Sequence, residues 1–210
     1  MAFDFKKEYK EFYLPPSKPG IVEIPGMNYL AVRGQGDPNA EDSDYKASIG
    51  LLYGVAFTLK MSWRSGHPIE GYFDYVVPPL EGFWWQEGRV GIDYAHKEDF
   101  RFLSVIRLPD FVTEEDFLWA RAEAAAKKGA DFSRVEFLPL EEGLCVQMLH
   151  VGPYDDEPVS IARMEDYLRQ QGFRPDFSET RLHHEIYLSD ARKVPPERRR
   201  TVLRHPIARL

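Results

Sequence analysis

Two acidic residues stand inside apolar, aromatic segments of the chain. Glu185 lies within His-His-Glu-Ile-Tyr-Leu, residues 183–188, and Asp74 lies within Gly-Tyr-Phe-Asp-Tyr-Val-Val, residues 71–77. An ionised carboxylate is costly to bury unless it has a partner or a chemical role. Burial among aromatic rings would shift the pKa of such a group and make it a candidate general base. We therefore take Glu185 and Asp74 as candidate functional residues. The alternative for Glu185 is a structural ion pair, and the alternative for Asp74 is a cap or a pair at the mouth of its strand.

The segment 78–85, Pro-Pro-Leu-Glu-Gly-Phe-Trp-Trp, adds a large aromatic surface. Its prolines and its Glu-Gly pair predict a strand end and a turn before three consecutive aromatic residues. Adjacent residues of an extended segment face opposite sides, so we expect one of Trp84 and Trp85 to line a cavity while the other packs. Tryptophan offers a ligand flat contact and cation–π attraction, and core packing is the alternative for both residues.

The sequence predicts neither a metal nor a cofactor. Adjacent His183 and His184 would point to opposite faces of a strand, and they lack the helical spacing of a zinc protease. The Gly-Gln-Gly of residues 34–36 lacks the third glycine of a dinucleotide loop, and Asp37 would repel phosphate. The single cysteine, Cys145, falls in an apolar strand and no Gly-x-Ser-x-Gly elbow is present, so nucleophilic catalysis is not expected.

Apolar periodicity and capping residues predict the elements that would position these side chains. Helices are expected at residues 45–62, 113–128 and 157–171. Branched and aromatic runs predict strands at residues 29–33, 72–77, 101–107, 144–151, 183–188 and 201–207.

These elements form two copies of a strand-helix-strand-strand unit, residues 21–112 and 130–210, joined by the helix at about 113–128. This order predicts an α+β fold with antiparallel sheets, helices on one face, a pseudo-twofold axis and a ligand cleft between the repeats. Residues 21–210 would be a single domain, and residues 1–20 would be a strap in front of it.

Side chains alternate along a strand, so His183, Glu185 and Tyr187 would share one face. Tyr72 and Asp74 would share a face in the same way. We expect these acid-bearing faces to line the cleft and to contact the ligand.

The strap is aromatic and charged, and the prolines at residues 15 and 16 close it. One interpretation is that it packs across the sheet. The other is that it covers the cleft and places the hydroxyl of Tyr9 or Tyr13 over a bound ligand. A tyrosine combines an apolar ring with a polar tip and suits either position.

The composition narrows the class of partner. The chain has 210 residues, 43% of them hydrophobic and 14% aromatic, with a net charge of −7. Binding to nucleic acid needs clustered cations, and spanning a membrane needs a long apolar run, so neither is expected. A start without a signal peptide and a lone cysteine predict a cytoplasmic location. We expect a monomer or weak homodimer whose partner is a small molecule.

Four motifs resemble those of the stand-alone GyrI-like small-molecule-binding proteins of bacteria. They are residues 34–39, 79–85, 150–158 and 183–190, and the likeness runs from about Tyr13 to Pro206. The resemblance implies a duplicated fold with a central ligand cleft, akin to the effector-binding domains of multidrug-responsive transcription activators. In those domains an acid that matches Glu185 meets cationic drugs. The chain lacks their helix-turn-helix extension, so a direct role in transcription is not implied.

Some stand-alone members of this family are hydrolases that open the strained cyclopropane of DNA-alkylating compounds, a detoxification activity. The resemblance implies that Glu185 activates water and that Tyr13 or Tyr9 donates a hydrogen bond to the developing oxyanion. The aromatic slot for the substrate would be Trp84, with Trp85 or Trp63 in support. One alternative is a drug-binding module that sequesters or senses its ligand without turnover. A gyrase-interacting protein is a further alternative.

Overall fold

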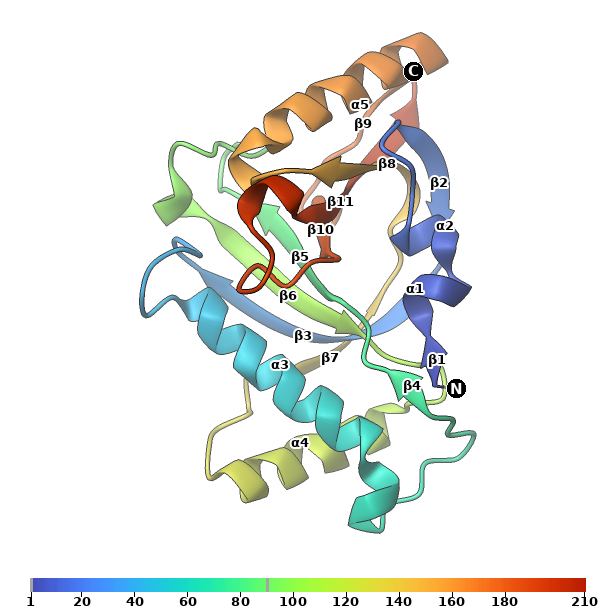
Figure 1. Ribbon diagram of the computed structural model, residues 1–210, viewed down its shortest axis with the longest axis vertical. Coiled ribbons are helices and arrows are strands. Elements are labelled where there is room, and N and C mark those ends of the chain that lie inside the picture. The colour runs from blue at the N-terminus through green and yellow to red at the C-terminus, as the bar shows by residue number, and fades with distance from the viewer. Residues whose placement is uncertain (1, 90) are drawn as a thin grey trace.

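The structure is a computed structural model that describes residues 2–89 and 91–210. Nine strands of this described part form one sheet, and all of its strand pairs are antiparallel. The sheet order is β2 (Gly20–Ile24), β8 (Gly143–Val151), β11 (Arg200–Arg209), β10 (His183–Tyr187), β5 (Leu80–Trp85), β6 (Arg101–Arg107), β3 (Met27–Gln35) and β7 (Glu136–Leu140). The remaining strand, β9 (Phe173–Pro175), pairs with β11 (Figure 1). The sheet ends at β2 and β7 and is not closed.

The sheet is built from two copies of one unit. The first is β3, α3 (Asp44–Lys60), β5 and β6, and the second is β8, α5 (Glu157–Gln171), β10 and β11. Outward from the centre the strands follow the same order, β5-β6-β3 on one side and β10-β11-β8 on the other. β5 and β10 pair with each other at the centre. This arrangement confirms the expected duplicated strand-helix-strand-strand fold of the α+β class.

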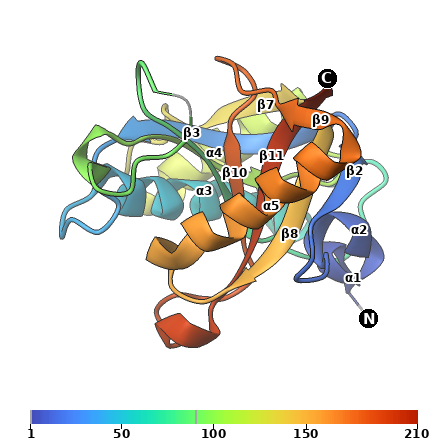
Figure 2. The ribbon, with the colours of Figure 1, turned by 90° about the horizontal axis from the view of Figure 1, so that it is seen from above.

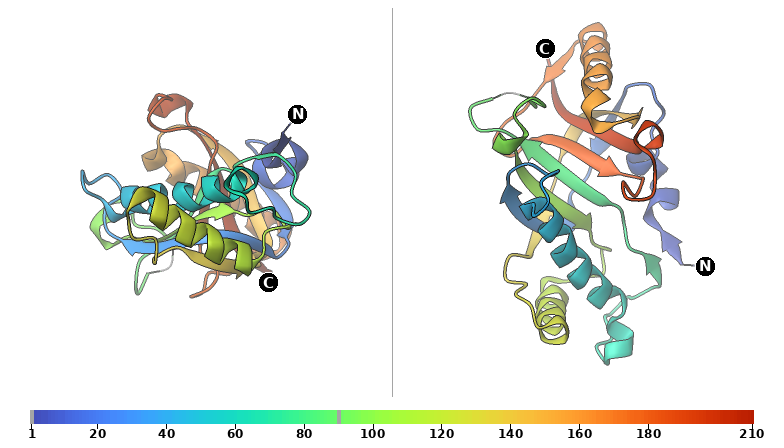
Figure 3. Two further views of the ribbon diagram at one scale, coloured as in Figure 1. Left: turned by 90° about the horizontal axis from the view of Figure 1, so that it is seen from below. Right: turned by 60° about the vertical axis from the view of Figure 1, so that its left-hand side comes forward.

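The three long helices cover one face of the sheet, which we call the front face. α3 and α4 (Glu114–Lys128) pack over Leu30 and Val32, and α5 packs over Met148 and Leu203. Strand register places these apolar residues on the same face as Glu185, because residues paired across a ladder share a face. Figure 3 (right) shows α3 and α5 over different halves of the sheet, and Figure 2 shows α5 crossing β8 and β11.

Local sequence explains where the helices begin and end. The Ser43 hydroxyl caps α3 by accepting from the Lys46 amide, and Thr113 and Asp116 form a capping box at the start of α4. α4 ends at Gly129, whose φ of 61° is a left-handed conformation that glycine adopts without strain. These boundaries confirm the expected helices. Among the described residues, no helix is long and apolar enough to cross a membrane.

The N-terminal strap lies on the opposite, back face (Figure 1, dark blue). Its helices α1 (Phe5–Glu8) and α2 (Lys10–Tyr13) bury Phe5 and Tyr13 in a cluster with Ile186 and Val202. Ile186 follows Glu185 on β10 and so points to the other side of the sheet. The strap therefore packs across the sheet, which is the first of the two arrangements that the sequence allowed.

The expected strand at residues 72–77 is wrong in extent. Only β4 (Tyr75–Val76) forms there, and it pairs in parallel with β1 (Phe3–Asp4) in a separate two-stranded sheet. The strand that meets β10 is β5, in the stretch expected to turn at Glu81-Gly82. Gly82 is needed inside that strand because a side chain would come within 2.8 Å of the Trp84 indole nitrogen and 3.0 Å of the Tyr187 hydroxyl. Short 3-10 turns complete the chain at Ser62–Ser65, Lys97–Asp99, Tyr154–Asp156 and Pro196–Arg198.

Candidate functional site

A cleft of about 520 Å³ opens on the front face and takes its lining from both repeats. β5 and β10 form its floor, the first turn of α3 forms one wall, and the 3-10 turn before α5 forms another. The side chains that shape its chemistry are Tyr45, Trp84, Tyr94, Tyr154, Glu185 and Tyr187. The cleft is thus an aromatic hollow with a carboxyl group at its base, the usual form of a small-molecule site.

Strand alternation puts the two tryptophans on opposite faces of β5, but each of them borders a hollow, so the expectation that one lines a cavity while the other only packs is wrong. Trp84 lies opposite His183 in the β5–β10 ladder and donates from its indole nitrogen to the Tyr187 hydroxyl at 2.9 Å. Its ring also packs on Tyr45, with centroids 5.1 Å apart. Trp85 packs against the apolar cluster of the back face. Trp84 is therefore the tryptophan of the cleft.

Glu157, the first residue of α5, is a member of the site that the sequence analysis missed. It is fully buried, and its Oε2 accepts from the Tyr94 hydroxyl at 3.0 Å. Its Oε1 is buried with no hydrogen-bond partner among the described residues. Burial and the adjacent charge of Glu185 raise the pKa of Glu157 well above its ordinary value. Sequence reasoning missed Glu157 because acidic residues are common in the first turn of a helix, where they stabilise the helix dipole by about 0.3–1 kcal/mol.

Glu157 and Glu185 thus form a carboxyl pair that cannot readily carry two charges. Among the described residues, the ion pair that Glu185 makes is with a histidine, His183, and no Lys or Arg neutralises either acid. Two carboxyls in contact resolve this by sharing one proton, which leaves one ionised and one neutral. The raised pKa of Glu157 assigns the shared proton to Glu157.

His183 holds Glu185 from behind. Its Nε2 lies 3.0 Å from Glu185 Oε1, and its Nδ1 lies 2.6 Å from His205 Nε2. Both histidines are buried, at 2% and 4% exposure. Burial and the neighbouring His183 lower the pKa of His205 well below its ordinary value, so His205 is neutral. The expected shared face of His183, Glu185 and Tyr187 is confirmed.

The tyrosines of the cleft remain protonated donors at neutral pH. Burial, followed by the charge of Glu185, raises the pKa of Tyr154 to about 12. Burial likewise raises the pKa of Tyr45, Tyr94 and Tyr187. Among the described residues, the Tyr154 hydroxyl makes no side-chain hydrogen bond, and the Arg199 guanidinium lies 5.3 Å from its ring centre. Tyr154 is therefore the hydroxyl best placed to serve a ligand.

Three of the expected ligand contacts lie away from this cleft. Asp74 is largely exposed and pairs with Lys60, 3.0 Å away, so the structure does not bring it together with Glu185. The Tyr72 hydroxyl donates to the Lys60 carbonyl at 2.8 Å. Trp63 is 55% exposed beside Arg64. These positions were chosen from the expected strand at residues 72–77 and from aromatic content, and neither guide locates the central strand β5.

The expected oxyanion donors lie on the back face. The Tyr13 hydroxyl lies 3.3 Å from Glu81 Oε1, and Tyr9 stacks on Phe12 and lies under Arg107. Glu81 adjoins Gly82, which pairs with Glu185, so Glu81 and Glu185 project from opposite sides of the sheet. Neither Tyr13 nor Tyr9 lines the cleft.

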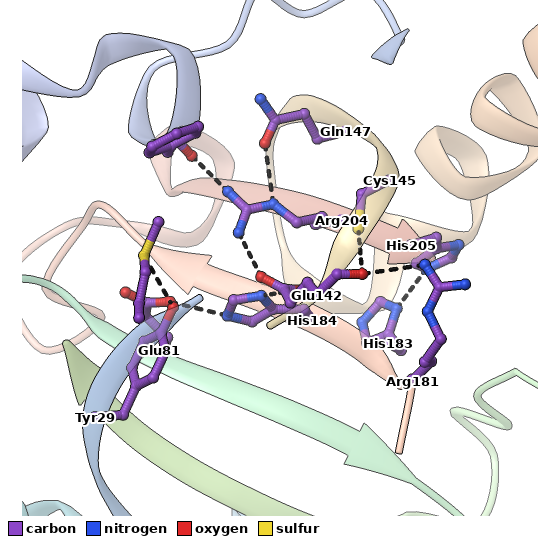
Figure 4. A network of polar contacts seen from close by, with 12 residues as sticks. Tyr29, Glu81, Glu142, Cys145, Gln147, Arg181, His183, His184, Arg204 and His205 are labelled. Atoms are coloured by element: carbon purple, nitrogen blue, oxygen red, sulfur yellow. Dashed lines mark hydrogen bonds and ion pairs between the residues drawn. The ribbon is translucent and has the colours of Figure 1, made fainter. Parts of the chain in front are cut away.

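Through Glu81, Tyr13 adjoins instead a buried polar network on the back face. Figure 4 shows Glu81, His184, Glu142 and Arg204 of this network. His184 Nε2 lies 3.0 Å from Glu81 Oε2, and its Nδ1 lies 3.0 Å from Glu142 Oε2. Arg204 contacts Glu142 at 2.7 Å. Burial opposes ionisation of Glu142, but the charges of His184 and Arg204 outweigh it and lower its pKa to about 2. Burial alone would lower the pKa of His184, but the neighbouring Glu142 and Glu81 raise it.

A metal ion is one alternative to the shared proton. Glu157, His183 and Glu185 each offer a ligand atom within 4.8 Å of the other two, a spacing that a metal ion would also fit. A single proton between the carboxyls, together with the bonds from Tyr94 and His183, satisfies the same atoms. The absence of a metal remains a prediction of the sequence analysis.

Residues 17–208 match the model of the GyrI-like small-molecule-binding domain. A solved structure of a hydrolase from Listeria innocua is 44% identical, with a TM-score of 0.89 over 99% of this chain and 100% of that one. An uncharacterized conserved protein from Listeria innocua is 46% identical, with a TM-score of 0.92 over the same shares. The C-terminal domain of EcmrR, at 13% identity and a TM-score of 0.55 over 92% of this chain and 98% of that domain, shares the fold alone. No curated protein matches the sequence.

Proposed function

The chain belongs to the GyrI-like small-molecule-binding family, and from this premise we propose that its cleft binds flat aromatic or cationic amphipathic molecules and hydrolyses those that carry a strained electrophilic ring. The substrate class we infer is a cyclopropane conjugated to a carbonyl group. Detoxification in the cytoplasm is the role that this chemistry suits, and the buried lone thiol of Cys145 is compatible with a reducing compartment.

Binding follows from the shape and charge of the cleft. Trp84, Tyr45 and Tyr154 offer ring faces and edges to a planar ligand. Glu185 supplies one negative charge among these rings, and a cation next to a carboxylate in an aromatic hollow gains both Coulomb and cation–π attraction. A volume of about 520 Å³ lies within the range of drug-sized pockets.

The observation that carries the catalytic proposal is the carboxyl pair of Glu157 and Glu185. One ionised and one neutral carboxyl in contact are a general base and a general acid at the same pH. Relatives that are 44–45% identical over 99% of this chain are described as hydrolases, which supports the proposal without naming a substrate.

The proposed reaction adds one water molecule across a carbon–carbon bond. Glu185 accepts a proton from water while the water oxygen bonds to the cyclopropane CH₂. The ring bond breaks, and its electron pair moves through the conjugated system to the carbonyl oxygen. The Tyr154 hydroxyl hydrogen-bonds to that oxygen as negative charge develops. Glu185 then gives up the proton it gained, the product oxygen takes up one proton, and the enzyme is restored.

The test uses spiro[2.5]octa-4,7-dien-6-one, which water converts to 4-(2-hydroxyethyl)phenol with a change in ultraviolet absorbance. We expect the wild-type protein to accelerate this conversion and Glu185→Gln to lose about 10²–10⁴-fold of the acceleration, the usual contribution of a general base. Asp74→Asn is the matched control, because Asp74 is an exposed acid paired with Lys60, and it should retain full turnover. Unchanged turnover in Glu185→Gln would remove Glu185 from catalysis.

A binding module without turnover is the second candidate, and the ionised acid within an aromatic hollow favours it as well. In that case tetraphenylphosphonium should bind by calorimetry, Glu185→Gln should weaken it, and no phenol should form on long incubation. Formation of phenol by the wild-type protein above the buffer rate would exclude this candidate.

A further inference from the structure

His183 adjoins a second hollow, which shares Trp84 with the cleft and otherwise has a lining of its own. This second hollow has a volume of about 450 Å³, and its wall includes Trp85, Phe177, Leu182 and His183. His183 also contacts Glu185, which lines the cleft, through its Nε2 at 3.0 Å. One buried imidazole ring thus connects the acid of the cleft with another space at the surface.

The connection continues into a chain of two histidines. His183 Nδ1 lies 2.6 Å from His205 Nε2, and the two rings appear together in Figure 4. The ring of His205 packs edge-on against Phe177, with centroids 4.9 Å apart. Phe177 lines the second hollow, so the hydrogen-bonded chain that starts at Glu185 ends one ring away from that hollow.

A base at the floor of a filled cleft needs a route for its proton. Glu185 is only 8% exposed, and aromatic side chains make up much of the cleft lining around it. A planar molecule that fills the cleft would exclude the water that otherwise exchanges protons with Glu185. We propose that His183 and His205 relay protons between Glu185 and the second hollow while the cleft is occupied. This inference rests on the proposed hydrolytic function.

The relay has two states that differ by one proton. In the first, Glu185 is ionised and accepts from His183 Nε2–H, while His183 Nδ1 accepts from His205 Nε2–H. A proton that enters at His205 Nδ1 moves the His205 Nε2 proton to His183 Nδ1 and the His183 Nε2 proton to Glu185. In the second state Glu185 is therefore protonated and donates to His183 Nε2, and both histidines carry their proton on Nδ1. The reverse sequence returns the proton to the second hollow.

A purely structural role would require no change of protonation in these residues. A single hydrogen bond from a fixed His183 tautomer would hold the Glu185 carboxylate, and His205 would only fill space. The relay requires both rings to change tautomer when Glu185 gains or loses its proton. The other titratable groups around Glu185 are Glu157 of α5 and Tyr45, Tyr94, Tyr154 and Tyr187 of the cleft. Four charged side chains also line the cleft: Lys46, Lys97, Asp155 and Arg199.

The first experiment is nuclear magnetic resonance on protein with ¹⁵N-labelled histidine and ¹³C-labelled glutamate carboxyls, saturated with tetraphenylphosphonium. His183→Gln and His205→Phe assign the signals. We expect the Glu185 carboxyl and the ring nitrogens of His183 and His205 to share one titration midpoint, with both rings passing from Nε2–H to Nδ1–H as Glu185 is protonated. A His183 ring that keeps one tautomer while Glu185 titrates would overturn the relay. This readout does not depend on turnover, so it separates the relay from the proposed hydrolysis.

The second experiment measures turnover of the spirodienone. His183→Gln can still donate to Glu185 but cannot pass a proton on, so we expect tetraphenylphosphonium affinity to stay within about threefold and turnover to fall about 10²-fold. Imidazole added to His183→Gly should restore at least tenfold of the lost rate, because it can occupy the space of the missing ring. His205→Gln, which retains a nitrogen toward His183, should be less impaired than His205→Phe. Full turnover in His183→Gln, or no recovery with imidazole, would assign His183 a structural role alone.

Discussion

Two neighbouring histidines of β10 lie on opposite faces of the sheet, and the charged groups around them differ. His184 points to the back face, where Glu81 and Glu142 flank it and Arg204 completes the group. His183 points to the front face, where it meets the Glu185 carboxyl. Each histidine is at most 2% exposed, so burial alone does not distinguish them.

The difference lies in whether the buried acids face cations. The back-face network holds two acids and two cations, because its environment raises the pKa of His184 and Arg204 is permanently charged. The front-face pair of Glu157 and Glu185 has no Lys or Arg ion pair among the described residues, and it borders an open cleft. A network that pairs its acids with cations rigidifies a fold, whereas acids without a cation can exchange protons or take up a ligand.

The largest expected effect is on the back face. Glu142→Gln leaves Arg204 and His184 buried without their shared acid, and removal of one partner of a buried ion pair costs about 3–5 kcal/mol of unfolding free energy. The measurement is urea unfolding followed by tryptophan fluorescence. Glu141→Gln, an exposed neighbour, is the control and should change the free energy by less than about 0.5 kcal/mol.

The same substitution on the front face should give the opposite pattern. Glu185→Gln should change the unfolding free energy by less than about 1.5 kcal/mol, the scale of one hydrogen bond, while it removes turnover. If Glu185→Gln were as destabilising as Glu142→Gln, the contrast between the faces would fail, because both acids would then be structural.

The second effect is a pH dependence specific to Glu157. The raised pKa of Glu157 in the folded protein means that its contribution to stability is fully present below the unfolded pKa of about 4.5 and is lost as pH rises through the folded pKa. Glu157→Gln cannot lose that proton. Its stability relative to wild type should therefore increase above about pH 4.5, by at most about 1.4 kcal/mol per pH unit.

Thermal unfolding of both proteins from pH 4 to pH 9 measures this difference. Glu142 should respond with the opposite sign, since its lowered pKa makes its contribution present above the unfolded value and lost as pH falls toward about 2. A constant difference between Glu157→Gln and wild type across the range would show that Glu157 is ionised in the folded state.

The sequence predicted the fold well because its signals were local. Ser43, Thr113 and Gly129 mark helix ends by their own backbone requirements, and the resemblance in four motifs set the order of the repeats. The pairing of β5 with β10 was not predicted, because Pro78 and Pro79 suggested the end of a strand where a central one begins. A glycine inside an aromatic strand marks a close approach of side chains, a tertiary fact that no local rule contains.

The candidate site was predicted in part for the same reason. Strand alternation placed His183, Glu185 and Tyr187 together and separated Trp84 from Trp85. Glu157 contacts Glu185 only because α5 begins over β10, and its acid looked like an ordinary helix start. Tyr13 was assigned to the cleft because a strap of tyrosines fits either face of a sheet, and only the packing of the strap decides which.

The third effect tests which tyrosine serves which face. Tyr13→Phe removes a buried donor near Glu81 Oε1, and we expect it to cost about 1–2 kcal/mol of unfolding free energy while tetraphenylphosphonium affinity and turnover stay unchanged. Tyr154→Phe should leave stability within about 0.5 kcal/mol and reduce turnover, by about 10-fold or more if it supports the developing oxyanion. Loss of turnover in Tyr13→Phe with normal stability would return Tyr13 to the site.

The smallest effect concerns the mouth of the cleft, where Lys97 pairs with Asp155 across the two repeats. Asp155 is 68% exposed, so the pair should contribute less than about 1 kcal/mol to stability. Lys97 nevertheless lines the cleft, so its positive charge acts on an entering ligand. Lys97→Ala removes a cation from the mouth, and the association rate of tetraphenylphosphonium should rise a few-fold at low salt.

Stopped-flow fluorescence at low and at 0.5 M salt measures that rate, because screening should abolish a long-range charge effect. Lys18→Ala, an exposed lysine before β2, removes the same charge outside the cleft lining and should leave the rate unchanged. Equal acceleration by both variants would trace the effect to net charge. Acceleration by Lys97→Ala alone, with unchanged stability, would show that charge on the front face governs ligand entry, whereas charge on the back face governs folding.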